Sequence, residues 1–197
     1  MMQIDYYMAT ISPFTYLCGT RPAEIAAKHG ATLTYKPLDI MALFGRTGGT
    51  PPKDRHENRK AYRLVEIRRT AAKVDMPINL QPAHWPANPA PSSYAIIAAA
   101  KDGSGDTAAL VARLTRACWA EERDIAQDDV IADCLEAAGF DRALVDKGMM
   151  EGAEIYARNL EQAVAAGVFG APFFIVDGEP FWGQDRLDDL DAFLAAR

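Results

Sequence analysis

The N-terminal stretch of this chain constrains its fold more than any other segment. Residues 3–8 read Gln-Ile-Asp-Tyr-Tyr-Met, an apolar and aromatic run that predicts a β-strand, and Ser12–Pro13 follows shortly after. Proline suits the first turn of a helix, because the N–H group that it lacks would have no partner there. We therefore expect a helix to begin at Ser12 and to run to about His29, since Gly30 is a favourable residue just after a helix end.

Ser12 has two possible roles at this helix start. Its hydroxyl can cap the helix by accepting a backbone N–H bond, which is the commoner role of serine at this position. Alternatively, the hydroxyl and the unpaired N–H groups at the positive end of the helix can bind an anion. The residues alone favour the cap, and the anion site stays open.

The middle of the chain reads as helical. Residues 32–37 predict a second strand, which completes a βαβ unit if the two strands are parallel. From residue 40 to about residue 150, apolar residues recur at helical spacing. A loop is expected at 45–52, and a proline-studded irregular segment at 77–91.

Strand character returns near the C-terminus. A helix over about 151–166 precedes a strand at 172–176. Asp177–Gly178 then predicts a tight hairpin turn, so a second strand should run back antiparallel to the first. Asp185 is expected to cap a final amphipathic helix.

This order of elements predicts an α/β protein with a thioredoxin-like fold. An all-helical domain is inserted between its βαβ and ββα halves. Residues 1–40 and 151–197 would form the thioredoxin-like domain, and residues 41–150 would form the inserted helical domain.

The composition narrows the class of protein further. The 197 residues are 49% hydrophobic and 24% charged, with no apolar run long enough to cross a bilayer and no signal-peptide pattern. We expect a cytoplasmic protein with no membrane partner. The net charge of −6 argues against nucleic acid as a partner. The three cysteines and three histidines occur singly, which predicts neither a disulfide framework nor a metal site.

Several motifs carry a resemblance to a known family. They are residues 7–17, ending in Ser-Pro-Phe-Thr-Tyr-Leu; Lys-Pro-Leu-Asp at 36–39; Ala-Tyr-Arg-Leu-Val-Glu at 61–66; Gly-Ala-Pro-Phe-Phe at 170–174; and Phe-Trp-Gly-Gln-Asp-Arg-Leu at 181–187. With these motifs the chain resembles the 2-hydroxychromene-2-carboxylate isomerases. That family is allied to the kappa-class glutathione transferases and to the DsbA-type oxidoreductases.

The residues at the helix start agree with this resemblance. A disulfide oxidoreductase would carry C-x-x-C where this chain has Ser12–Pro13–Phe14–Thr15, so the protein cannot itself exchange disulfides there. A hydroxyl at a positive helix end suits an external thiolate, such as that of glutathione. Ser12 is therefore the expected catalytic residue, as a hydrogen-bond donor to sulfur. It is not expected to be a nucleophile, because no histidine stands nearby in sequence to act as its base.

The resemblance also implies a glutathione site near the C-terminal motifs. Ala171–Pro172 stands where thioredoxin-like folds carry a cis-proline beside the active site. Glutathione would pair with the backbone of Ala171 as an extended peptide does. Asp185 would hold the α-amino group of the γ-glutamyl moiety, with Gln184 and Arg186 nearby, or it would serve as a helix cap.

Residues 46–69 contain eight Lys and Arg residues against three acidic ones. This run is either a solvated face or a positive cleft that attracts anions. Lys53 and Asn58 are candidates for binding glutathione, and Arg59 for binding substrate. Trp85 and Asn88 resemble the family segment that faces the aromatic substrate, and loop packing is their alternative role.

Three functions follow from these readings. The first is a glutathione-dependent isomerase of aromatic catabolism, acting on 2-hydroxychromene-2-carboxylate as a homodimer, the oligomeric state that the resemblance implies. The second is a kappa-like transferase that consumes glutathione. The third is a non-catalytic thioredoxin-fold module that binds extended peptides at Ala171–Pro172.

Overall fold

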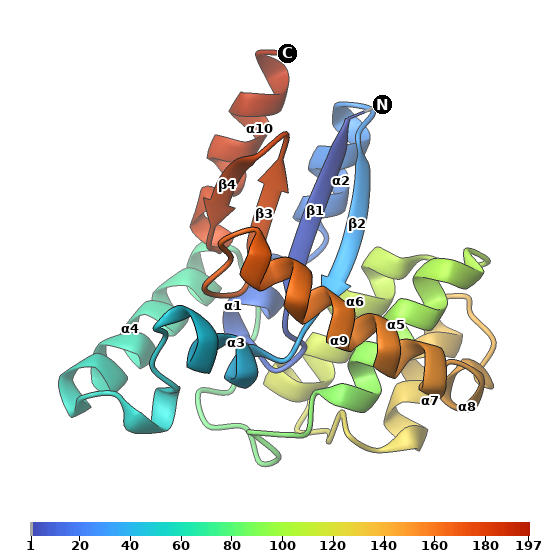
Figure 1. The fold of residues 1–197 in the computed structure, drawn as a ribbon. Coiled ribbons are helices and arrows are strands. Elements are labelled where there is room, and N and C mark those ends of the chain that lie inside the picture. The colour runs from blue at the N-terminus through green and yellow to red at the C-terminus, as the bar shows by residue number, and fades with distance from the viewer. Residues whose placement is uncertain (1) are drawn as a thin grey trace.

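The computed structural model describes residues 2–197 as one mixed sheet with a block of helices at one end (Figure 1). The strands are β1 (Gln3–Met8), β2 (Thr32–Pro37), β3 (Phe173–Val176) and β4 (Glu179–Trp182). The α-helices are α1 (Pro13–Tyr16), α2 (Arg21–Lys28), α3 (Ile40–Thr47), α4 (Glu57–Lys73), α5 (Ala90–Asp102), α6 (Thr107–Ala120), α7 (Asp128–Ala137), α8 (Leu144–Lys147), α9 (Met149–Ala165) and α10 (Leu187–Ala195). Two short 3-10 helices are η1 (Pro52–Asp54) and η2 (Gln184–Arg186).

The sheet has the strand order β2-β1-β3-β4. β1 and β2 are parallel, whereas β3 is antiparallel to both β1 and β4. A parallel pair needs a crossover, which α1 and α2 provide, while an antiparallel pair can be joined by a tight turn. At the centre of the sheet the rings of Tyr6 and Phe174 stack with their centroids 4.6 Å apart. This arrangement confirms the predicted thioredoxin-like α/β fold.

The hairpin between β3 and β4 forms as the sequence predicts. Asp177 and Gly178 have φ angles of 48° and 84°, both positive. A two-residue turn with positive φ at both positions matches the twist of the strands that it joins, and Asp-Gly is among the pairs that adopt it most readily.

The helix predicted from Ser12 to His29 is wrong in one respect, because it is broken into α1 and α2. α1 ends at Tyr16, and Gly19 lies in the left-handed region at φ 55°. α2 then starts afresh at Arg21, with Pro22 in its first turn. Proline has no N–H to continue the preceding helix but fits the start of a new one, so the interruption falls here.

A second correction concerns the loop expected at 45–52. Asp39 caps α3 by accepting hydrogen bonds from Met41 N and Ala42 N, and the helix then continues to Thr47. It ends at Gly48, whose φ is 78°. Gly45 is tolerated within the helix because a single glycine there costs only about 1 kcal/mol relative to alanine.

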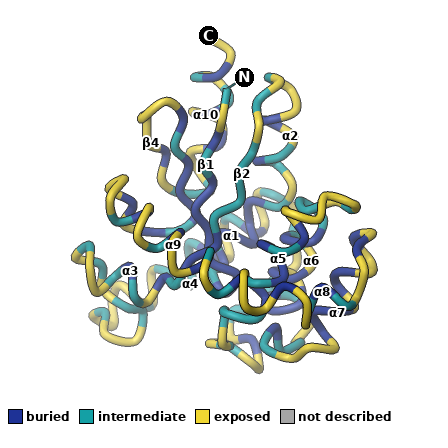
Figure 2. The backbone as a smooth tube through the Cα atoms, turned by 45° about the vertical axis from the view of Figure 1, so that its right-hand side comes forward, coloured by how far each residue is buried: buried dark blue, intermediate teal, exposed yellow. Residues whose placement is uncertain are grey.

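The helices α3 to α8 gather beyond the lower end of the sheet in Figure 1, and α9 crosses in front of that end. α9 packs mainly against α5 and also contacts β2 and α3, so it touches both parts of the predicted two-domain division. β1 is buried along most of its length, as the dark tube in Figure 2 shows. The division at residues 40 and 150 stays a prediction.

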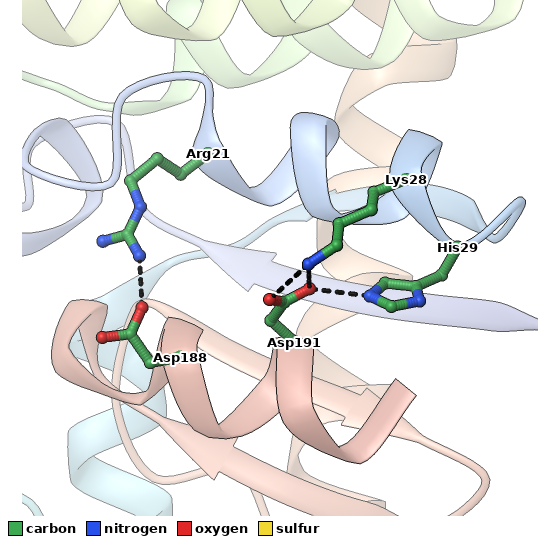
Figure 3. Close-up of polar contacts among 5 residues, drawn as sticks. All are labelled: Arg21, Lys28, His29, Asp188 and Asp191. Atoms are coloured by element: carbon green, nitrogen blue, oxygen red, sulfur yellow. Dashed lines mark hydrogen bonds and ion pairs between the residues drawn. The ribbon is translucent and has the colours of Figure 1, made fainter. Parts of the chain in front are cut away.

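Ion pairs join α10 to α2 on the other face of the sheet (Figure 3). Asp191 accepts hydrogen bonds from Lys28 Nζ and His29 Nε2, each at 2.7 Å, and Arg21 pairs with Asp188 at 2.7 Å. The hydrogen bonds from Lys28 and His29 lower the pKa of Asp191. These contacts are largely solvent-exposed, so they orient α10 more than they stabilise the fold.

Candidate functional site

Ser12 follows the end of β1 and begins α1. Its backbone is extended, and its hydroxyl oxygen accepts a hydrogen bond from Thr15 N at 3.3 Å. The same hydroxyl donates to the carbonyl oxygen of Ala171 at 3.4 Å. Ser12 is therefore a helix cap, as the residues alone favour, and it also joins α1 to the segment before β3. Both hydrogen bonds are long, so the hydroxyl can turn to another acceptor at little cost.

The shortness of α1 changes the physical basis of the expected anion site. A macrodipole grows with the number of aligned peptide units, and α1 spans only Pro13–Tyr16. The donors at this helix start are therefore individual groups rather than the field of a long helix. They are the Ser12 hydroxyl and the N–H of Phe14, which has no hydrogen-bond partner within residues 2–197.

The segment before β3 faces Ser12. The Ala171–Pro172 peptide bond is cis, as the resemblance implies. The Pro172 carbonyl accepts a hydrogen bond from Gly183 N at 3.0 Å, which ties this segment to the start of η2. Ala171 N–H has no partner in the described part of the chain. An unpaired backbone donor thus lies beside the Ser12 hydroxyl.

The proline-rich segment brings Trp85 to the same place. Trp85 Nε1 donates to the carbonyl oxygen of Ile11 at 3.0 Å, one residue before Ser12. Its half-buried ring packs at a tilt against Trp119, with the centroids 5.7 Å apart. Asn88 is exposed, and its Oδ1 accepts a hydrogen bond from Ala90 N at the start of α5. Both residues therefore make the contacts expected of loop packing, and their substrate roles stay predictions.

Gln184, Asp185 and Arg186 form η2 directly after Gly183. The expected helix cap at Asp185 is wrong, because α10 begins only at Leu187 and its cap residue is Arg186, without a side-chain cap bond. Gly183 has a φ of 112°, which turns the chain into the 3-10 helix before α10 can start. The exposed Asp185 carboxylate instead pairs with Arg186 at 2.9 Å.

The basic candidates are exposed and, among the described residues, form no hydrogen bond with this cluster. Lys53 is exposed in η1, and Asn58 and Arg59 are exposed in the first turn of α4. In the described part of the chain, none of the three side chains forms a hydrogen bond or an ion pair with Ser12, Ala171 or Pro172. Their binding roles stay predictions.

Arg63 is a residue that the sequence reading missed. It lies one helical turn after Arg59, and its guanidinium stands over the ring of Trp85, with Cζ 5.4 Å from the ring centroid. The signal was present, because positions 63, 67 and 71 share one helix face and Ile67 and Ala71 are buried there. Treating the charge run as one group obscures the cation that lies over Trp85.

The protein's own thiols are chemically inert. Cys18, Cys118 and Cys134 are all buried and unpaired. Burial raises the pKa of Cys18 and of Cys118 to about 12, and that of Cys134 to about 11. All three thiols are protonated at neutral pH, so none supplies a thiolate. The charge of Asp185 contributes a smaller part of the raised pKa of Cys18.

Residues 2–197 contain no group of three or more His, Cys, Asp or Glu side chains that could hold a metal ion. In the same residues, no helix has the length and apolar character required to cross a bilayer.

Known proteins resemble this chain over nearly its whole length. The model of the DsbA-like thioredoxin domain matches residues 3–195. A 2-hydroxychromene-2-carboxylate isomerase from Sphingobium xenophagum is 30% identical over 97% of each chain. The chain belongs to the 2-hydroxychromene-2-carboxylate isomerase family.

Solved structures support membership of this family and its fold. A structure of 2-hydroxychromene-2-carboxylate isomerase superposes with a TM-score of 0.79 at 26% identity, covering 99% of this chain and 95% of that one. The cytosolic disulfide reductase DsbM from Pseudomonas aeruginosa, solved with GSH, superposes with a TM-score of 0.70 over 98% of each chain. At 20% identity, the second likeness shows the fold alone.

Proposed function

We propose that this protein is a glutathione-dependent isomerase that interconverts 2-hydroxychromene-2-carboxylate and trans-o-hydroxybenzylidenepyruvate in the catabolism of naphthalene-type aromatic compounds. The observation that carries the proposal is the place of Ser12, which begins α1 beside Ala171–Pro172. A disulfide oxidoreductase of this fold would carry C-x-x-C there. A hydroxyl cannot exchange disulfides, but it can hold the thiolate of an external thiol by donating a hydrogen bond.

The groups around Ser12 fit the cysteinyl part of glutathione. The unpaired N–H of Ala171 is a donor of the kind that an extended peptide uses when it pairs with a strand. The Ser12 hydroxyl and the unpaired N–H of Phe14 are two further donors. Hydrogen bonds to a thiolate favour its charged form, so these donors would lower the pKa of a thiol bound beside them.

Ser12 and the backbone N–H groups of Phe14 and Ala171 would hold glutathione, which would supply a thiolate for reversible addition to the conjugated double bond of the ring-opened substrate. Ser12 stabilises the charge on sulfur at both stages, because the thiolate is present before addition and after release. Trp85, fixed by its hydrogen bond to Ile11, presents an apolar ring next to Ser12 for the aromatic part of the substrate. The buried cysteines of the chain take no part.

The remaining candidates bind the outer parts of the two ligands. Asp185 holds the α-amino group of glutathione, with Gln184 and Arg186 beside it. Lys53 and Asn58 bind glutathione, and Arg59 and Asn88 bind substrate. The active unit is a cytoplasmic homodimer, and analytical ultracentrifugation of the purified protein tests that state.

The proposal is tested by following isomerisation of 2-hydroxychromene-2-carboxylate spectrophotometrically, with and without glutathione. Turnover should require glutathione, and the glutathione concentration should be the same before and after many turnovers. Turnover that is equally fast in protein freed of all small thiols would contradict the proposal.

The same experiment separates the alternatives. A kappa-like transferase would consume one glutathione per product, which thiol titration detects. A non-catalytic peptide-binding module would show no turnover and would bind unrelated extended peptides without glutathione.

A further inference from the structure

Arg63 is a half-buried cation without an acidic partner. Among the described residues, its side chain forms no ion pair and no hydrogen bond. Its guanidinium lies over the ring of Trp85. The charge of Glu66, on the same helix, acts to raise the pKa of Arg63, but the two side chains form no ion pair. A buried guanidinium that lacks an anion is costly unless a ligand supplies one.

A second arginine adds to this positive field. Arg55 precedes α4, and its Nε donates to the Thr50 carbonyl at 2.8 Å while its guanidinium lies 5.8 Å from the centroid of the Phe44 ring. Burial, followed by the charge of Arg55, lowers the pKa of Arg63 to about 10. The pKa of Arg55 is lowered as well, by burial and by the charge of Arg59. Repulsion between these cations is relieved when an anion binds between them.

A continuous set of contacts connects Arg63 with Ser12. The guanidinium lies over the Trp85 ring, and the Nε1 of the same ring donates to the carbonyl of Ile11 at 3.0 Å. Ile11 is the neighbour of Ser12 in sequence. A chain of contacts therefore leads from the residue before Ser12, through the Trp85 ring, to a cation that has no ion-pair partner among the described residues.

We propose that Arg63, assisted by Arg55, binds the carboxylate of an aromatic carboxylate substrate whose ring lies against Trp85 and whose reacting carbon points toward Ser12. This inference rests on the proposed function, and it names the residue that selects anionic over neutral substrates. The planar guanidinium matches a carboxylate through two parallel hydrogen bonds, a geometry that lysine cannot provide. Lys53 and Arg59, by contrast, are exposed to solvent, so they discriminate less between ligands.

Direct binding measurements test the inference without any need for turnover. The probes are trans-cinnamate and its neutral amide, trans-cinnamamide, titrated calorimetrically into the protein with and without saturating glutathione. The wild type should bind cinnamate more tightly than cinnamamide. Arg63→Gln should weaken cinnamate binding about tenfold to a hundredfold, as expected when a charge-assisted hydrogen bond is lost, and should leave cinnamamide binding nearly unchanged.

Two further variants separate recognition from packing. Arg63→Lys keeps the charge without the forked geometry, so its affinity for cinnamate should lie between those of the wild type and Arg63→Gln. Arg69→Gln removes an exposed cation from the same helix and should bind both probes like the wild type. Thermal unfolding of each variant shows whether the contact between Arg63 and Trp85 also supports the fold.

The outcome distinguishes this inference from the proposed function. Equal binding of both probes to the wild type, no binding of cinnamate, or an equal loss of both probes in Arg63→Gln overturns the role of Arg63, even if the protein isomerises its substrate with glutathione. A loss confined to cinnamate supports the role of Arg63, even if glutathione-dependent turnover is absent. Where turnover is present, Arg63→Gln should raise KM for the carboxylate substrate more than it lowers kcat.

Discussion

At Ser12, one hydroxyl serves two neighbours, because it accepts from Thr15 N and donates to the carbonyl of Ala171. A serine that only capped a helix would need the first of these bonds and not the second. The second bond turns the hydroxyl toward Ala171, whose N–H is unpaired in the described part of the chain. In the proposed function, this local arrangement contributes more than the helix dipole to binding a thiolate.

Replacing Ser12 with alanine should abolish most turnover while costing on the order of 1 kcal/mol of unfolding free energy, the usual contribution of a cap. The measurements are the glutathione-dependent isomerisation rate and urea unfolding. Asp106→Ala is the matched control, because Asp106 caps α6 through Ala109 N at 3.0 Å and lies outside the proposed site. A folded Ser12→Ala protein with wild-type turnover would leave Ser12 as a cap alone.

A second prediction concerns the side chain of Asp185. Since Asp185 pairs with Arg186 on the surface and caps no helix, Asp185→Asn should leave the unfolding free energy unchanged. Its affinity for glutathione should fall by about 1.5–3 kcal/mol, roughly tenfold to a hundredfold, by isothermal titration. Asp189→Asn removes the other acidic partner of Arg186 and should bind glutathione normally.

A glutathione analogue that lacks the α-amino group completes this test. It should bind the wild type and Asp185→Asn almost alike, because neither protein can then use that contact. If Asp185→Asn binds intact glutathione as tightly as the wild type does, the placement of the γ-glutamyl group is wrong.

At the scale of elements, α10 is attached to α2 through Asp191 (Figure 3). Its hydrogen bonds with Lys28 and His29 lower the pKa of Asp191 below the usual value of about 3.9. A carboxylate whose pKa is lower in the folded state stabilises the fold above its unfolded pKa. That contribution is lost as the pH falls through the folded pKa. The attachment of α10 therefore weakens in acid.

We expect Asp191→Asn to lower the urea midpoint slightly near pH 7, and the difference from wild type to disappear as the pH falls below about 4. Urea titrations at a series of pH values measure this. Asp188→Asn is the comparison, because its more exposed pair with Arg21 should contribute less at every pH. A difference for Asp191→Asn that persists undiminished at pH 2 would show that its effect is not ionic.

For the whole molecule, the proposed reaction takes its thiol from outside the chain. Cys18 follows α1, Cys118 lies in α6 and Cys134 lies in α7. Burial raises the pKa of each thiol and keeps it protonated at neutral pH. The variant Cys18→Ala/Cys118→Ala/Cys134→Ala should keep glutathione-dependent turnover. It should lose about 1 kcal/mol of unfolding free energy per buried group removed.

Both the turnover rate and the unfolding midpoint of the triple variant are measured, because turnover can also be lost when the protein unfolds. A stable triple variant without turnover would mean that a protein thiol, rather than glutathione, takes part in the reaction.

The strands and the hairpin turn could be predicted from the sequence alone. Strand alternation and Asp177–Gly178 are local signals, and a local backbone preference survives into the fold. The family resemblance also implied that Ala171–Pro172 lies beside Ser12, although 159 positions separate Ser12 from Ala171. The break between α1 and α2 and the late start of α10 were missed, because the left-handed conformations of Gly19 and Gly183 depend on how the chain must turn to pack.

Which of the eight basic residues at 46–69 lies over the Trp85 ring became apparent only in the folded structure. The sequence marked Lys53 and Arg59, which are exposed, whereas folding places Arg63 over Trp85. The sequence does not distinguish these residues, because the burial of a basic side chain and its neighbours from distant segments are set by packing. In this case the neighbour is a ring held by a hydrogen bond to Ile11, 74 positions away in sequence.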